Sequence, residues 1–134
     1  IGNNPERLRL YRILDSISSE ERLIAFEKEL EDRFGTPPAE SMELMNVVRL
    51  RWMAIQLGFE KIILKKDRMI IHFISNPDSG YFASPTFKMV LNFIQIQGRK
   101  FEMKESNGKL RLSTDSITSV SMAMEVMYKI LKMS

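Results

Sequence analysis

The stretch "KFEMKESNGKLRLST" (residues 100–114) decides the fold class, because its pattern predicts a β-hairpin. The central pair Asn107-Gly108 suits a type I′ turn, in which both residues take a positive φ angle. On either side of it, apolar side chains alternate with charged ones, so one face of the hairpin is buried and the other meets water. The apolar positions are Phe101, Met103, Leu110 and Leu112.

The chain on either side of this hairpin alternates between strands and helices. Upstream, "EKIILKKDRMIIHFIS" (60–75) contains two β-rich runs around Lys66-Asp67, which predicts a second hairpin. Between the hairpins, Ser84-Pro85 is typical of an N-cap followed by proline at the first helical position. After the second hairpin, a last helix is predicted from Val120, Met124, Met127 and Leu131.

The first 58 residues predict three helices, because apolar residues recur there at helical spacing. The predicted boundaries rest on Asn4-Pro5, a capping box from Ser18 to Glu21, Gly35, Thr36-Pro37 and Gly58. The predicted core stripes are Leu10, Ile13, Leu14 and Ile17, then Leu23, Phe26, Leu30 and Phe34, then Leu44, Met45, Val48, Trp52 and Ile55.

Three helices followed by β-β-α-β-β-α predict an α+β fold, with a small antiparallel sheet packed against helices. We expect the two hairpins to share one sheet. We also expect residues 1–134 to form a single domain, with a helical part at 1–58 and the β-β-α-β-β-α part at 59–134. Because the chain begins with Ile1, we expect it to be a fragment of a larger protein.

Composition limits the class of protein. The chain has no cysteine, which excludes disulfides, thiolate zinc sites and cysteine nucleophiles, and it fits a cytoplasmic protein. No apolar run approaches the ~20 residues that a membrane span requires, so no membrane partner is expected. Charge is divided unevenly: residues 1–58 carry 8 basic and 10 acidic side chains, whereas residues 59–134 carry 12 and 7. Opposed charges of this kind suit protein contacts at least as well as nucleic-acid contacts.

The sequence offers no catalytic constellation. It lacks a phosphate-binding loop and a nucleophile elbow, and no metal or organic cofactor is predicted. His72, the single histidine, lies in an apolar run and is interpreted as a structural residue, because a metal site needs several convergent ligands. The ten methionines fall largely on core stripes and are interpreted as adaptable packing. We therefore expect this chain to have no enzymatic activity.

Two surfaces remain as candidates for binding. The basic residues of the hairpins, among them Lys65, Lys66 and Arg111, permit weak DNA binding, although edge-strand lysines also prevent aggregation. The other candidate is the second helix, whose core stripe leaves an outer face of Arg22, Ala25, Glu29, Asp32 and Arg33. Glu29 and Arg33 form an i,i+4 pair in the favourable order. Exposed charges on a helix usually contact only water, so this face is open to both interpretations.

The stretch from Glu6 to Ile17, "L-x-DRFG-x-x-P" (residues 30–38) and the segment Arg49–Gly58 together resemble the C-terminal regulatory domain of the bacterial transcription-repair coupling factors (Mfd). The resemblance covers most of residues 5–65. It implies a domain without catalysis of its own, belonging to an ATP-dependent DNA translocase with its motor upstream.

The resemblance also implies a partner and a mechanism. The domain would pack on the N-terminal UvrB-like module of the same protein, mask its UvrA-binding surface and restrain the motor that acts on stalled RNA polymerase. The interdomain contact would involve Glu29, Asp32 and Arg33, with Arg22 beside them, and we expect the chain to be a monomer. Arg49 and Arg51 would lie near this contact or brace Glu27 or Glu31. The alternative function is an auxiliary DNA-binding domain that uses the basic hairpins.

Overall fold

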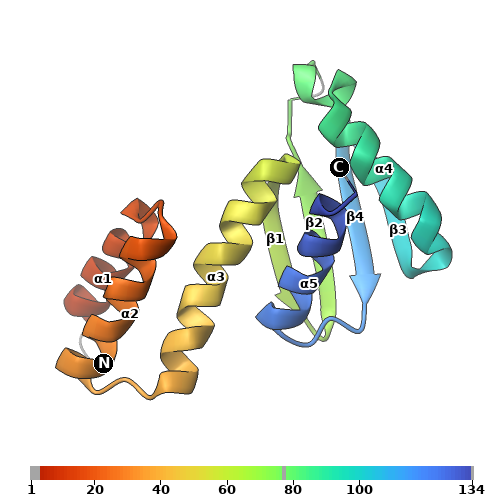
Figure 1. Ribbon diagram of the computed structural model, residues 1–134. Helices are drawn as coiled ribbons and strands as arrows, with labels where there is room; N and C mark the ends of the chain where they lie inside the picture. Colours follow the sequence, from red (N-terminus) through yellow and green to blue (C-terminus); the bar gives the residue numbers. More distant parts are fainter. Residues whose placement is uncertain (1–3, 77, 134) are drawn as a thin grey trace. The chain divides into compact units, whose positions relative to one another are not determined.

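The computed structural model describes residues 4–76 and 78–133. Within them it contains five α-helices and one four-stranded antiparallel sheet, which confirms the predicted α+β class (Figure 1). Contacts within the chain divide it into two compact units, Ile1–Arg49 and Leu50–Ser134. The division falls inside the third helix.

The first unit contains α1 (Asn4–Ser16), α2 (Glu20–Phe34) and the beginning of α3 (Pro38–Leu57). The predicted cap of α2 is wrong by one residue, since Ser19 and not Ser18 accepts a hydrogen bond from the Arg22 backbone N–H at 3.3 Å. Ser18 lies in the connection between α1 and α2, directly after Ile17, which is only 3% exposed. Gly35 ends α2 in the left-handed conformation, as predicted.

The start of α3 is also one residue later than predicted. The Pro37 carbonyl accepts hydrogen bonds from the backbone N–H groups of Glu40 and Ser41, at 3.0 and 3.1 Å, which places Pro37 at the cap. The predicted apolar stripe of α3 is only partly correct. Met45 and Val48 are buried, whereas Ile55 is 67% exposed. Past Arg49 the buried positions of this helix are Leu50, Ala54 and Leu57, which belong to the core of the second unit.

The second unit is built on β1 (Phe59–Lys65), β2 (Arg68–Phe73), β3 (Phe101–Ser106) and β4 (Lys109–Asp115). The strands lie in the order β1-β2-β4-β3, so the two hairpins share one sheet as predicted. Both predicted turns are confirmed: Lys66 and Asp67 have φ angles of 53° and 60°, and Asn107 and Gly108 have 54° and 76°. A β-bulge interrupts the pairing of β1 and β2 between Phe59 and Lys61.

Helices cover one face of this sheet. α4 (Pro85–Gln97) begins at the predicted cap Ser84, and α5 (Val120–Leu131) begins after Ser119. Two short 3-10 helices, Gly80–Ala83 and Gly98–Lys100, flank α4. Both α4 and α5 lie in front of the strands in Figure 1. Their buried side chains join those of the strands in one core: Val90, Phe93, Ala123, Met127 and Ile130 with Met69, Ile71, Phe73 and Leu112.

Candidate functional site

Helix α2 presents its outer face to solvent because its buried side is occupied by the core stripe. Leu23, Phe26 and Leu30 are between 0% and 6% exposed, as predicted, whereas Phe34 is only partly buried. All five residues of the predicted outer face are exposed: Arg22, Ala25, Glu29, Asp32 and Arg33. The helical spacing of the sequence therefore located this face correctly.

The charged side chains of this face differ in whether they form an ion pair. The Arg33 Nη1 donates to Glu29 Oε1 at 2.7 Å, and the two side chains remain 68% and 45% exposed. An exposed i,i+4 pair stabilises a helix by only about 0.3–0.5 kcal/mol. The Arg33 guanidinium also lies 5.7 Å from the centre of the Phe34 ring. No described residue forms an ion pair or side-chain hydrogen bond with the Asp32 carboxylate or the Arg22 guanidinium.

Other charges of the first unit bind its helices together. Arg49 donates from Nε and Nη2 to the two carboxylate oxygens of Glu20 at 2.7 and 2.8 Å, a bidentate pair between α3 and the start of α2. These hydrogen bonds lower the pKa of Glu20 and raise that of Arg49. Arg49 Nη1 also donates to Asn46 Oδ1 at 3.0 Å. The hydrogen-bond partner of Arg49 is therefore Glu20. The predicted partner Glu27 acts on Arg49 through its charge, which also raises the pKa of Arg49, whereas the other predicted partner, Glu31, accepts a hydrogen bond from Ser41.

Glu31 has a separate internal partner. The Ser41 hydroxyl donates to Glu31 Oε2 at 2.7 Å and to the Pro38 carbonyl at 3.0 Å. Ser41 is fully buried, so its carboxylate partner satisfies a polar group inside the unit. Four of the six acidic residues of α2 thus fall into two classes. Glu20 and Glu31 join α2 to α3, whereas Glu29 and Asp32 lie on the outer face.

The basic residues of the hairpins also lie at the surface, with Lys61, Lys65, Lys66, Lys104, Lys109 and Arg111 all exposed. His72 is partly buried on β2, opposite Lys61 of β1 and Arg111 of β4. Among the described residues, no group of three or more His, Cys, Asp or Glu side chains is placed to hold a metal ion. No helix in the described chain has the length and hydropathy to cross a membrane.

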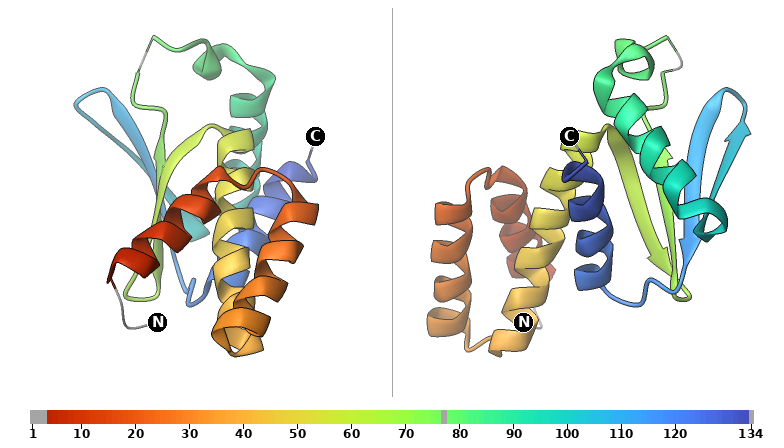
Figure 2. Two further views of the ribbon diagram at one scale, coloured as in Figure 1. Left: turned by 90° about the vertical axis from the view of Figure 1, so that its left-hand side faces the viewer. Right: turned by 45° about the vertical axis from the view of Figure 1, so that its right-hand side comes forward.

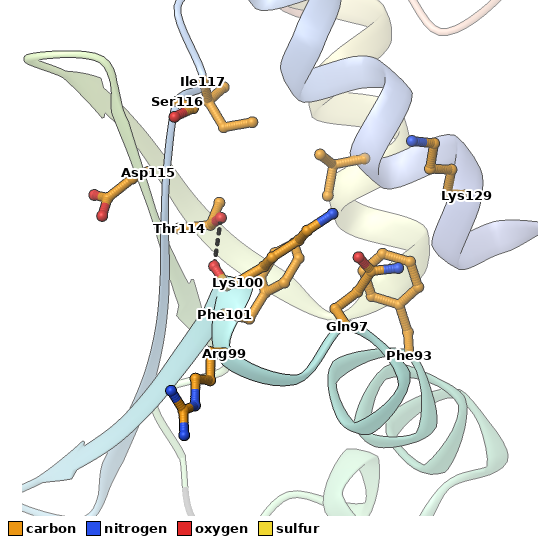
Figure 3. A pocket seen from close by; sticks show the side chains of 11 residues that line it. Phe93, Gln97, Arg99, Lys100, Phe101, Thr114, Asp115, Ser116, Ile117 and Lys129 are labelled. Atoms are coloured by element: carbon orange, nitrogen blue, oxygen red, sulfur yellow. Dashed lines mark hydrogen bonds between the residues drawn. The ribbon is translucent and has the colours of Figure 1, made fainter.

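A hollow of about 400 Å³ between the ends of α4, β3 and α5 was not predicted. Phe93 and Phe101 pack edge to face in it, with ring centres 5.5 Å apart. Figure 3 shows the amines of Lys100 and Lys129 above these rings, with Arg99 and Asp115 directed away. The Thr114 hydroxyl donates to the Lys100 carbonyl at 2.7 Å. The hydroxyl of Thr114 is therefore engaged in fixing the start of β3.

Comparison with known proteins places the chain in a family. A family model described as the TRCF domain matches residues 1–83, more than half of the chain. The chain belongs to the TRCF domain family. The match includes all of α2 and its "DRFG" segment, the part of the sequence that carried the predicted resemblance, and so confirms it.

Individual relatives agree with this assignment. The transcription-repair-coupling factor of Rickettsia typhi is 24% identical over 107 residues, which are 80% of this chain and 9% of that protein. That of Rickettsia conorii is 28% identical over 101 residues, 75% of this chain and 8% of that protein. The TRCF domain chain thus spans less than a tenth of the length of these relatives.

A solved structure shares the fold of this TRCF domain chain. The crystal structure of the C-terminal domain of transcription-repair coupling factor superposes with a TM-score of 0.66 and covers 99% of this chain and 83% of the other. The sequences are 14% identical, so this likeness concerns the fold alone. This likeness assigns no role to the side chains on the outer face of α2.

Proposed function

We propose that this TRCF domain chain is the regulatory interaction domain of a transcription-repair-coupling DNA translocase and has no catalytic activity of its own. In the resting protein, the outer face of α2 packs on the N-terminal UvrB-like module of the same polypeptide. This contact masks UvrA binding and restrains the motor until it opens.

The observation that carries the proposal is the division of acidic residues on α2. Glu20 and Glu31 have partners on α3, whereas Glu29 and Asp32 lie outward beside the exposed Arg22 and Arg33. An incoming arginine would displace only the Glu29–Arg33 pair, which is worth about 0.3–0.5 kcal/mol. A charge-assisted hydrogen bond to a partner is worth about 1.5–3 kcal/mol, so the exchange is favourable.

A polar contact suits a domain that has to be released. Charged groups regain water when they separate, whereas an apolar seam would expose surface that water solvates poorly. Within one polypeptide the two surfaces are tethered, and the tether raises their effective concentration. A contact that is too weak to hold two separate molecules together can therefore remain closed in the intact protein.

The test compares UvrA binding by the whole translocase and its charge-reversal variants. Glu29→Lys and Asp32→Lys should each remove one charge-assisted contact and raise the open fraction of a largely closed protein at least about tenfold, with a matching gain in UvrA affinity. Glu43→Lys is the matched control, because Glu43 is an exposed acidic residue on α3 of the same unit. Unchanged UvrA affinity in both α2 variants, or an equal gain in the control, would exclude this face as the contact.

A further inference from the structure

The sheet of the second unit carries a row of basic side chains that crosses all four strands. His72 of β2 pairs in register with Lys61 of β1 and with Arg111 of β4, and Arg111 pairs in turn with Lys104 of β3. Residues opposite one another on neighbouring strands point to the same face of a sheet. These four residues, the basic row, therefore stand side by side although they come from sequence positions up to 50 residues apart.

The basic row lies on the face of the sheet that α4 and α5 leave uncovered. On β2 the covered face takes Met69, Ile71 and Phe73, which are at most 2% exposed, and the alternate position His72 belongs to the opposite face. Lys61, Lys104 and Arg111 are all exposed. In both figures of the whole chain, α4 and α5 lie on the same side of the strands (Figures 1 and 2).

Charge on this open face is concentrated at one end. Lys109 follows the same alternation as Arg111 and adds another cation beside the row, and a hollow of about 240 Å³ lies among His72, Lys104, Lys109 and Arg111. Two acidic groups are close to the row. Glu102 Oε1 lies 3.1 Å from the amine of Lys104, and the exposed Glu60, directly before Lys61 on β1, accepts a hydrogen bond from the Ser75 backbone N–H at 2.9 Å. Asp115 pairs with Arg68 at 3.4 Å near the opposite end of the strands. The end of the sheet that holds the basic row therefore carries a clear excess of positive charge.

The same face lacks aromatic anchors. Its strand positions hold Lys61, Ile63, Lys65, Arg68, Ile70, His72, Glu102, Lys104, Ser106, Lys109, Arg111, Ser113 and Asp115. No Phe, Tyr or Trp is among them. Single-stranded nucleic acids are held largely by stacking of their bases on aromatic rings, so a single strand fits this face poorly.

A duplex backbone fits it well. Strands in a sheet are about 4.8 Å apart, so the row is about 14 Å long. A duplex segment of that length carries roughly eight phosphates, since DNA has one charge per about 1.7 Å of axis. Cations without stacking partners contact phosphates and read no sequence.

We infer that this open face is a binding site for the phosphate backbone of double-stranded nucleic acid, with Lys61, Arg111, Lys104 and Lys109 as the phosphate contacts. The site lies in the second unit and uses none of the residues of the outer face of α2. It also extends past the family match, which ends at residue 83, because Lys104, Lys109 and Arg111 follow that point. The binding strengthens the hold of the translocase on duplex DNA and is independent of the proposed interdomain contact.

The test uses the 134-residue chain and a fluorescently labelled 20-base-pair duplex of arbitrary sequence, with anisotropy recorded at several salt concentrations. We expect a dissociation constant of about 10⁻⁶–10⁻⁴ M that is indifferent to base sequence. Three to four phosphate contacts should give a slope of about −3 to −4 in log K against log salt, so affinity should fall on the order of a hundredfold between 50 and 200 mM salt. In Lys61→Glu/Arg111→Glu the slope should become shallower by about 2.

Lys88→Glu is the matched control, because Lys88 is an exposed lysine on α4 and this helix covers the other face. This variant should bind like the original chain. The proposal is overturned if the duplex does not bind at 50 mM salt, if the control loses as much affinity as the row variant, or if the single strand binds more tightly than the duplex. Competition by poly-glutamate at an equal charge concentration would also overturn it, in favour of an acidic protein partner.

Discussion

Gly58, which joins α3 to β1, is the position where a single methyl group should damage the second unit most. Its φ angle is +79°, and a Cβ atom built there would overlap the ring of Tyr81. That ring is held in place. Its hydroxyl donates to the Leu57 carbonyl at 2.6 Å, and it packs against Phe82 and Phe87 with ring centres 5.3 and 5.4 Å away.

The cost of Gly58→Ala has two parts. A left-handed conformation costs an alanine about 1–2 kcal/mol. Displacing the Tyr81 ring also loses a hydrogen bond worth about 1 kcal/mol and part of its aromatic packing, about 0.5–1.5 kcal/mol. We therefore predict a total loss of about 2.5–4.5 kcal/mol in the free energy of unfolding. Gly108→Ala is the control, because Gly108 has a φ angle of +76° but no atom within 4 Å of its Cβ position. Gly108→Ala should lose only the cost of the left-handed conformation, about 1–2 kcal/mol.

The assay is urea unfolding of each variant, followed by circular dichroism and by the amide signals of the sheet. Replacing the ring tests the cause, since Gly58→Ala should cost only about 1–2 kcal/mol in a Tyr81→Leu background. The reasoning fails if Gly58→Ala and Gly108→Ala are equally destabilising, or if the cost at Gly58 is the same with and without the tyrosine ring.

Three further predictions concern stability. Burial raises the pKa of Tyr81, so the contribution of Tyr81 to the free energy of unfolding is complete below the ordinary tyrosine pKa of about 10 and is lost as pH rises above it. Tyr81→Phe should therefore reduce the loss of stability at alkaline pH. An unchanged loss of stability in this variant would contradict the prediction. The hydrogen bonds from Arg49 lower the pKa of Glu20, so Glu20→Gln should reduce the free energy of unfolding by about 0.5–1 kcal/mol at pH 7. This loss should become smaller as pH falls through the range in which carboxyl groups titrate, as measured by thermal unfolding. A loss that does not depend on pH would refute the role of the Glu20–Arg49 pair. Leu57→Ala should cost about 2–5 kcal/mol, whereas Ile55→Ala, at a site that is 67% exposed, should stay within about 0.5 kcal/mol; equal losses in urea unfolding would refute the assigned burial.

Local signals predicted the elements of this fold well, because each is set by a few neighbouring residues. Positive φ angles at Lys66 and Asn107 follow from the turns that the strand patterns demand. The helix caps were harder, since adjacent candidates compete: Ser18 and Ser19 both carry the required oxygen, and Ser19 is the one that caps α2. Periodicity failed at Ile55, because α3 contributes to two cores and no single stripe describes it.

The candidate surfaces were predictable to different degrees. The outer face of α2 depends on the spacing within one helix, so the sequence located all of its residues. The partner of Arg49 could not be obtained in this way, because Glu20 is 29 positions away and the pair depends on how two helices pack. The basic row depends on register between two hairpins, above all on the pairing of His72 with Arg111, and no local pattern encodes that pairing.

The distribution of charge between the two units has a functional consequence. The outer face of α2, with two acidic and two basic residues, belongs to the unit Ile1–Arg49, whereas the basic row belongs to Leu50–Ser134. Away from these surfaces, Glu43→Lys makes the same charge change as Asp32→Lys, and Lys88→Glu makes half the charge change of Lys61→Glu/Arg111→Glu. Long-range effects of net charge can be subtracted on this scale. If a translocase carrying Lys61→Glu/Arg111→Glu keeps its UvrA response while Asp32→Lys alters it, the two units carry separate functions. A shared response would mean that one contact spans both, because independent sites have additive effects.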